Sequence, residues 1–228
     1  MEAVQDWMVR HAAVRQGAAP GTSTSEACHD KNESMANLSS TASPTLLTAD
    51  DLARLDDPNG LPHELVRGVL RLVTPTFLAH GSVVMRVSAA LIQHVYSHGL
   101  GELFGESTGF LLERDPDTVL CPDVAFVASR RLPPEGLLGR GFPELAPDLA
   151  VEVLSKSNRP REVRDKVADY LRLGVRCVWV VDPAKRLVRI HTADGAEGLV
   201  GEDGILEGGE ILPGFRCPVA SLFVALRR

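Results

Sequence analysis

One stretch constrains the fold of this chain more than any other, because residues 147–183 have the pattern of a strand, a loop, a helix and a second strand. The first strand, Asp148–Leu154, is apolar except for its opening residue and Glu152. The helix begins with Pro160, which suits a first turn, and stops at Gly174, which suits a C-terminal cap. An apolar strand of this kind predicts the centre of a sheet, where an ionised carboxylate is costly unless it is paired or binds a cation.

The helix in this stretch is predicted to lie on the sheet that carries Glu152. Its polar face consists of Arg161, Asp165, Ala168 and Arg172, and its apolar stripe consists of Val163, Val167, Tyr170 and Leu171. Lys166 lies at the border of the stripe and therefore leans toward the surface that the stripe covers. A carboxylate and an ammonium are thus expected to converge.

Composition bounds the possible functions. The chain has 228 residues, is 44% hydrophobic and carries a formal net charge of -6, which argues against a general polyanion-binding coat but allows a local basic groove. The four cysteines are scattered, with no CxxC pair, so a structural zinc site is not expected. Cys121 and Cys177 are both predicted inside strands. Since neither a membrane-length apolar run nor a secretory leader is present, we expect a reduced, cytoplasmic protein.

The chain has two regions that differ in amino-acid composition. Residues 1–44 are rich in Ser, Thr, Ala and Gly, so a poorly ordered extension without an assigned function is predicted there. Residues 45–228 are predicted to form one α/β domain, with a mixed β-sheet flanked by helices. Its other expected elements are a Thr48-capped helix over 48–55, a hairpin over 63–74, a helix over 78–98, strands over 101–112, 119–128 and 186–192, and a long loop over 129–146.

Four residues stand out because each interrupts an apolar element: Glu64, Asp123, Glu152 and Lys166. Two carboxylates on neighbouring strands, here Asp123 and Glu152, can hold a hard divalent cation such as Mg²⁺. Such a cation polarises a phosphoryl oxygen and acidifies water, while a nearby lysine orients that water or stabilises developing charge.

Each of these residues also has a plain structural interpretation. A lone Asp after Pro122 is usually a turn or capping residue, and a lone Lys on a helix border usually extends to water. Glu64 has Arg67 and Arg71 nearby in the hairpin as surface partners. Glu152 is harder to explain in this way, because its apolar neighbours leave little room for a solvated side chain.

Residues 63–226 resemble the Uma-two family of endonucleases, within the PD-(D/E)XK restriction-endonuclease-like superfamily. The resemblance lies in an ordered set of motifs: HELVRG (63–68), the helix opening at His80, CPDVAFV (121–127), PDLAVEVLS (147–155), REVRDKVADYLRLGV (161–175) and VWVVDP (178–183). It implies a restriction-endonuclease-like core, Asp123 and Glu152 as ligands of Mg²⁺ or Mn²⁺, and Glu64 as an additional acid. It also implies a homodimer.

The chain departs from the superfamily pattern at one position. The usual lysine two residues after the second acid is replaced by Leu154, and Lys166 on the next helix matches the family's relocated lysine. His80 also matches a family position, although most histidines at helix starts only cap or pack. Asp148 either adds to the surroundings of the cation or simply starts its strand.

The expected function is hydrolysis of phosphodiester bonds, most simply in DNA, with Asp123 and Glu152 as metal ligands, Lys166 acting on the nucleophilic water and Glu64 assisting. A non-cleaving module of the same fold, which binds nucleic acid or protein, is the alternative from another class. A metal-dependent hydrolase of small phosphoesters is a third. The arginines at 159, 161, 164, 172 and 176 either contact a nucleic-acid backbone or form a solvated helix face.

Overall fold

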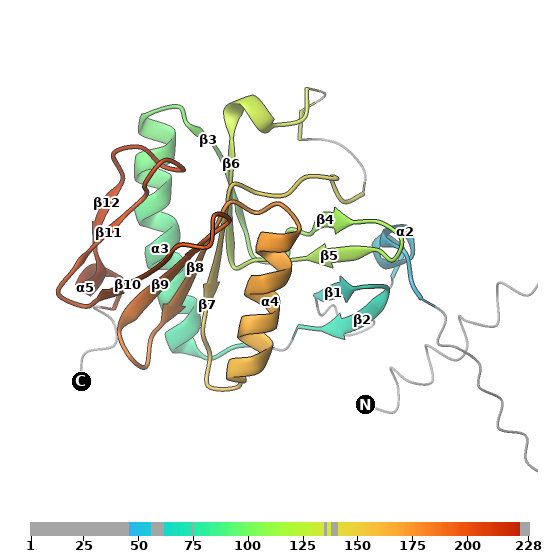
Figure 1. The fold of residues 1–228 in the computed structure, drawn as a ribbon, viewed down its shortest axis with the longest axis horizontal. Coiled ribbons are helices and arrows are strands. Elements are labelled where there is room, and N and C mark those ends of the chain that lie inside the picture. The colour runs from blue at the N-terminus through green and yellow to red at the C-terminus, as the bar shows by residue number, and fades with distance from the viewer. Residues whose placement is uncertain (1–45, 56–61, 74, 135, 138–140, 224–228) are drawn as a thin grey trace, which may run out of the picture. The chain divides into compact units, whose positions relative to one another are not determined.

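The structure is a computed structural model, which describes residues 46–55, 62–73, 75–134, 136–137 and 141–223. The predicted extension over residues 1–44 lies outside this range. Figure 1 shows an α/β fold in which helices flank a central mixed sheet, as the sequence predicts. Within the described residues, the helices are α2 (Ala49–Ala53), α3 (Leu78–Ser97), α4 (Pro160–Arg172) and α5 (Val219–Leu222), with a 3₁₀ turn at Ser129–Arg131.

The strands in the described part of the chain form three sheets. The central sheet has the order β10-β9-β8-β7-β6-β3, a smaller one has the order β2-β1-β5-β4, and β11 pairs with β12. The bounds are β1 (His63–Val66), β2 (Val69–Leu72), β3 (Gly101–Gly105), β4 (Phe110–Glu113), β5 (Thr118–Leu120), β6 (Val124–Ala128), β7 (Leu149–Val153), β8 (Cys177–Asp182), β9 (Leu187–Thr192), β10 (Glu197–Gly201), β11 (Ile205–Glu207) and β12 (Arg216–Pro218).

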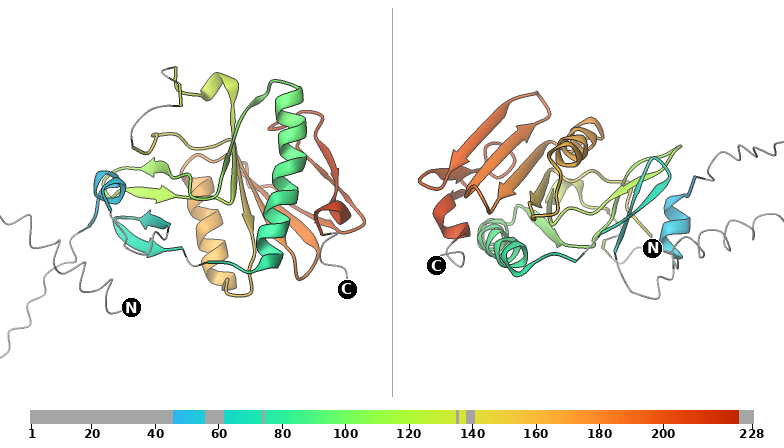
Figure 2. Two further views of the ribbon diagram at one scale, coloured as in Figure 1. Left: turned by 180° about the vertical axis from the view of Figure 1, so that it is seen from behind. Right: turned by 90° about the horizontal axis from the view of Figure 1, so that it is seen from below.

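The stretch that dominates the sequence forms the parallel unit β7-α4-β8 at the middle of the central sheet. Because side chains alternate along a strand, β8 contributes residues to the hydrophobic cores on both faces of the central sheet. Val178 and Val180 pack with Val167 and Tyr170 of α4, whereas Trp179 packs with the buried stripe of α3 on the opposite face. Figure 2 shows α3 and α4 on opposite sides of the sheet. The expected strand, helix and second strand are confirmed.

The predicted helix near Thr48 and the hairpin around Arg67 are also confirmed. The Thr48 hydroxyl accepts a hydrogen bond from the Asp51 N–H, and the Asp51 carboxylate accepts one from the Thr48 N–H, which together form a capping box. In the hairpin, Arg67 and Gly68 both have positive φ, the geometry of a tight two-residue turn.

Two sequence predictions of single long strands are wrong. The expected strand over 101–112 splits into β3 and β4, and the one over 119–128 splits into β5 and β6; each pair divides between the two larger sheets. Pro122 cannot donate to a strand ladder, and the Cys121 N–H bonds to a side chain instead, which ends the pairing of β5. Cys121 therefore lies in the crossing between sheets and not inside a strand. Both crossings lie beside the predicted site residues.

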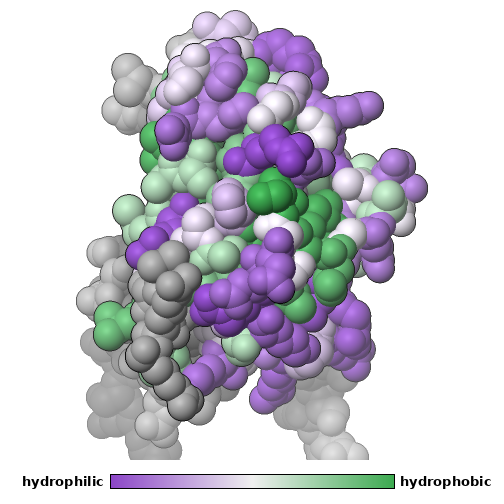
Figure 3. Space-filling view, turned by 90° about the vertical axis from the view of Figure 1, so that its left-hand side faces the viewer, coloured by the Kyte–Doolittle hydropathy of each residue, from purple (hydrophilic) through white to green (hydrophobic). Residues whose placement is uncertain are grey.

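The surface at the left of Figure 1 mixes polar and apolar groups. Figure 3 shows a hydrophobic patch on this face surrounded by hydrophilic residues. Exposed large apolar side chains of the described residues include Met85 and Ile92 on α3 and Leu199 on β10. Within the described part of the chain, no helix combines the length and apolar character that crossing a membrane requires.

Candidate active site

Three of the four predicted residues meet through the ammonium group of Lys166. Its Nζ lies 2.9 Å from Glu64 Oε1 and 2.8 Å from Glu152 Oε1. These residues come from α4, β1 and β7, so the ammonium joins the small sheet to the central sheet. The side chains of Glu64, Glu152 and Lys166 are 9%, 17% and 24% exposed, which keeps the cluster close to solvent without exposing it fully.

The helical position of Lys166 explains why it points inward. It lies three residues after Val163 and four before Tyr170, both of which pack toward the sheet. The fully buried Tyr170 donates its hydroxyl to Glu152 Oε1 at 2.8 Å, the same oxygen that Lys166 contacts. The prediction that the border lysine of α4 leans toward Glu152 is confirmed by this contact.

Glu64 does not pair with the arginines of its own hairpin. Its Oε1 accepts the Cys121 N–H at 2.9 Å and faces Lys166, while Arg67 pairs with Asp169 on α4 at 2.6 Å. Burial, followed by the charge of Glu64, raises the pKa of the Cys121 thiol to about 12. That thiol is therefore protonated at neutral pH and is a poor nucleophile.

Asp123 joins the cluster through sheet register. Since Val124 of β6 lies opposite Val151 of β7, Asp123 is level with Glu152 on the next strand. Its Oδ2 accepts the Val153 N–H at 2.6 Å and lies 3.2 Å from His80 Nε2. The Asp123 side chain is 18% exposed. The contact with the Val153 N–H at the end of β7 matches the capping role that the sequence left open for this carboxylate, and the contact with His80 is additional to it.

The electrostatics of the cluster are unbalanced. The carboxylates of Glu64 and Glu152 share one ammonium group, and the charge of Asp123 also acts on Glu152. Burial raises the pKa of Glu152 to about 7, because the lowering effect of Lys166 is opposed by the charges of Asp123 and Glu64. Burial lowers the pKa of Lys166, but the two glutamates outweigh it, so the lysine stays protonated. An excess of negative charge with a perturbed carboxyl is typical of a functional site.

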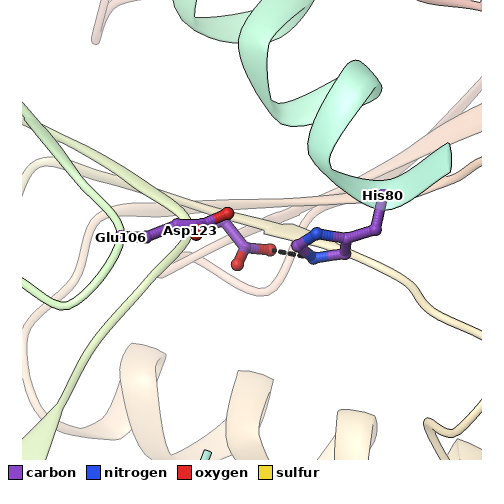
Figure 4. Close-up of side chains that lie close together, drawn as sticks. All are labelled: His80, Glu106 and Asp123. Atoms are coloured by element: carbon purple, nitrogen blue, oxygen red, sulfur yellow. Dashed lines mark hydrogen bonds and ion pairs between the residues drawn. The ribbon is translucent and has the colours of Figure 1, made fainter. Parts of the chain in front are cut away.

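His80 and Glu106 lie beside Asp123 on the side away from Lys166. Figure 4 shows His80 reaching from α3 toward Asp123, with Glu106 close by. One ligand atom from each of the three side chains lies within 4.8 Å of the others. Burial lowers the pKa of His80, but the hydrogen bond and charge of Asp123 outweigh this, so the pKa lies above its ordinary value.

Sequence reasoning did not find Glu106. This residue lies within a predicted continuous strand, and no local motif marks it. The signal lies in the register of β3 against β6, in which Gly105 is opposite Val124, so Glu106 is level with Asp123. Antiparallel register cannot be derived from one strand alone, and the true end of β3 was not predicted.

Asp148 has a structural role at the other end of β7. It is fully buried, and its carboxylate accepts the Ala128 N–H at 2.9 Å and pairs with Arg131 and Arg176 at 3.0 and 3.2 Å. Of the two interpretations that the sequence left open, the one in which Asp148 anchors its strand matches these contacts.

The candidate nucleic-acid-binding arginines of α4 divide into two groups. Arg172 pairs with Glu113 at 2.7 Å, which ties the helix to β4. Arg159 and Arg161 lie 3.9 and 3.7 Å from Glu162 and Asp165 on the same helix and are more than four-fifths exposed. Their guanidinium groups remain accessible to a polyanion.

The donor chemistry of the site fits a hard divalent cation. Lys166 and Tyr170 both use Oε1 of Glu152, and the hydrogen bonds to Asp123 both use Oδ2. The second oxygen of each carboxylate has no hydrogen bond or ion pair to another described residue. Mg²⁺ needs only one or two carboxylates, with waters and phosphate oxygens supplying the remainder.

Comparisons with known proteins agree with this fold. Residues 49–220 match the Uma2 family, described as "Putative restriction endonuclease". A solved structure from Anabaena variabilis, titled as a putative nuclease belonging to DUF820, superposes with a TM-score of 0.69 at 18% sequence identity. The match covers 79% of this chain and 99% of the Anabaena chain. No curated protein matches the chain.

Proposed function

The chain belongs to the Uma2 family, and from that premise we propose that it is an endonuclease that hydrolyses phosphodiester bonds in DNA with a divalent cation, Mg²⁺ or Mn²⁺. The family gives the nuclease class, and the cation and the DNA substrate are the proposal. One observation carries it: Lys166 bridges Glu64 and Glu152 while Asp123 lies level with Glu152 on the adjoining strand.

The residues have distinct proposed roles. Asp123 and Glu152 would hold the cation, whose chemistry is to polarise a phosphoryl oxygen and to acidify water. Lys166 orients the attacking water and stabilises negative charge that develops on the phosphate. Glu64 holds the Lys166 ammonium together with Glu152 and so helps to set its direction.

The accessible arginines at the start of α4 support a polyanionic substrate. The turn after β7 carries Lys156, and Arg159 and Arg161 follow on the same exposed segment. Cations near a cleavage site contact phosphates on either side of the reacting one and fix the register of the strand. Their contribution to binding weakens as salt concentration rises.

A plasmid assay tests the proposal. Supercoiled DNA is incubated with the full chain in Mg²⁺ or Mn²⁺, and cleavage is expected to stop on addition of EDTA. Lys166→Met is expected to lower the cleavage rate about 100-fold, since one preorganised charge near the reacting phosphate is typically worth this much. Lys185→Met, in an exposed turn, is the matched control and should cleave normally.

Other outcomes decide between the remaining functions. DNA binding without cleavage, unchanged by Lys166→Met, would identify a non-cleaving module. Turnover of a small phosphodiester with no effect on DNA would identify a small-molecule hydrolase. The proposal includes a homodimer, because two equivalent sites suit two DNA strands, and light scattering measures this. A cytoplasmic location is likewise proposed and is tested by cell fractionation.

A further inference from the structure

Three acidic residues lie side by side where the central sheet ends. Glu106 follows β3, Asp123 precedes β6, and Glu152 lies near the end of β7, and the strand registers place all three at one level. Asp123 is therefore flanked by a carboxylate on each side. The proposed function uses the side toward Glu152, and the side toward Glu106 has no assigned role.

The side toward Glu106 also contains a nitrogen donor. His80 approaches from the first turn of α3, is 5% exposed, and directs Nε2 at Asp123 Oδ2. Its other ring nitrogen, Nδ1, lies 3.0 Å from the Thr76 hydroxyl, which is outside the cluster and fixes the plane of the ring. A histidine held in this way through its second nitrogen has the arrangement common among metal-ligating histidines.

The two carboxylates at this position have His80 as their neighbouring basic side chain, and it contacts Asp123. The Glu106 side chain forms no ion pair or hydrogen bond with another side chain of the described residues, although ligand atoms of Glu106, Asp123 and His80 lie within 4.8 Å of one another. His80 and Asp123 form the inner wall, while Glu106 is exposed and leaves the position open to solvent. A cation can therefore enter without rearrangement of the fold.

We propose that His80, Glu106 and Asp123 form a second cation position, adjoining the one between Asp123 and Glu152 and selective for a transition-metal ion such as Mn²⁺. The inference rests on the proposed function only in that the two positions share Asp123. An imidazole ligand favours Mn²⁺ over Mg²⁺, because Mg²⁺ prefers oxygen donors.

Binding requires a defined proton movement. His80 must present the lone pair of Nε2, so any proton on Nε2 passes to solvent and one is kept on Nδ1. The Thr76 hydroxyl accepts that Nδ1–H, since a hydroxyl can accept as well as donate. No other group has to change its protonation state.

Electron spin echo spectroscopy of Mn²⁺ bound to the full chain tests the site directly, because a coordinated imidazole nitrogen modulates the Mn²⁺ signal. The wild-type protein is expected to show nitrogen coupling, and His80→Gln is expected to lose it. His98→Gln is the control, since His98 is an exposed residue at the other end of α3. Coupling that persists in His80→Gln, or Mn²⁺ that binds without coupling, would overturn the inference, as would the absence of Mn²⁺ binding at millimolar concentrations.

A second variant keeps the test independent of the folding of His80→Gln. Glu106→Gln changes an exposed residue and is expected to weaken Mn²⁺ binding about tenfold and Mg²⁺ binding less. Glu210→Gln, also exposed, is the matched control. Equal Mn²⁺ affinity in Glu106→Gln and wild type would contradict the site. Plasmid cleavage without nitrogen coupling would refute this inference alone, whereas nitrogen coupling without cleavage would refute the proposed function alone.

Discussion

Asp148, which directly precedes β7, and Glu152, within β7, lie four positions apart, and their surroundings differ in one decisive respect. Asp148 faces two guanidinium groups, of Arg131 and Arg176, whereas Glu152 shares the single ammonium of Lys166 with another glutamate. Burial raises the pKa of both carboxyls. For Asp148 the Ala128 N–H and the arginines overcome that effect and lower the pKa, but for Glu152 the pKa remains raised, at about 7.

Under the proposed function, this difference separates a structural acid, Asp148, from a cation ligand, Glu152. Around Asp148, positive charge exceeds negative charge, so the carboxylate is already satisfied by the protein. Around Glu152, negative charge exceeds positive charge, and the cluster retains the capacity to bind a cation. Position within an apolar strand does not distinguish the two residues; the partners that tertiary structure brings to each one do.

The largest expected effect is on stability, at the Asp148 end. Asp148→Ala leaves two arginines facing a buried site without their carboxylate and removes the acceptor of the Ala128 N–H. We expect the free energy of unfolding to fall by about 3–5 kcal/mol. Urea denaturation measures it, with Asp203→Ala, an exposed change, as the control. If the free energy of unfolding falls by less than ~1 kcal/mol, Asp148 does not have the structural role described here.

A substitution of Glu152, near the other end of β7, is expected to affect catalysis instead of stability. Glu152→Gln keeps the shape of the side chain and its contact with Tyr170 but removes a proposed cation ligand. The plasmid cleavage rate is expected to drop about 10²–10³-fold while the protein stays folded. Glu162→Gln, on the exposed first turn of α4, should leave the rate unchanged. Wild-type cleavage by Glu152→Gln would exclude this carboxylate from the reaction.

The pKa of Glu152 is raised and that of Asp148 is lowered, so the two residues are expected to change the stability of the fold with pH in opposite directions. The folded chain holds the Glu152 proton up to about pH 7, whereas the unfolded chain loses it near 4.5, so ionisation of Glu152 reduces stability as pH rises through that window. Glu152→Gln should therefore gain stability relative to wild type between pH 5 and pH 8. Lys166 stays protonated throughout and adds no slope.

For Asp148 the sign is reversed. Its lowered pKa stabilises the fold above the unfolded value of 3.8, and that stabilisation is lost as pH falls through the folded pKa. The deficit of Asp148→Asn should be constant from pH 5 to pH 8 and shrink in acid. Urea denaturation at several pH values compares both variants, and parallel curves for the two would refute the contrast.

A smaller effect is expected from Tyr170→Phe. The Tyr170 hydroxyl orients Glu152, and its loss costs a hydrogen bond to a charged group, which is typically worth about 1.5–3 kcal/mol. We expect cleavage to slow about tenfold, with the cation concentration for half-maximal rate raised. If only stability changes and the cation dependence does not, Tyr170 is a packing residue and does not position Glu152.

The smallest effect on stability and cleavage is expected from a substitution of Arg172, the last residue of α4. Arg172→Ala breaks an exposed pair with Glu113, and such pairs contribute at most about 1 kcal/mol to stability. Cleavage should be unchanged, because this pair is separate from the Lys166 cluster. A large loss of activity in Arg172→Ala would indicate that Arg172 contacts the nucleic acid.

Much of this arrangement could be predicted from local pattern. The unit β7-α4-β8 followed from an apolar strand, Pro160 and Gly174, and the direction of Lys166 followed from helical spacing. The sheet crossings at Cys121 and near Glu106 could not be predicted, because a continuous apolar pattern does not reveal which sheet each half joins. The pairing of Asp148 with Arg131 and Arg176 could not be predicted either, because both arginines are distant from Asp148 in the sequence.

The most direct test of the proposed site is a crystal structure of the protein soaked in Mn²⁺, examined by anomalous scattering. We predict a peak within direct ligand distance of the Asp123 carboxylate, shared with Glu152, and a second one on the His80 and Glu106 side. Glu152→Gln should lose the first peak. Saturating Mn²⁺ with no peak at Asp123, or a peak only at the Asp148 end of β7, would contradict a cation-dependent site at this position.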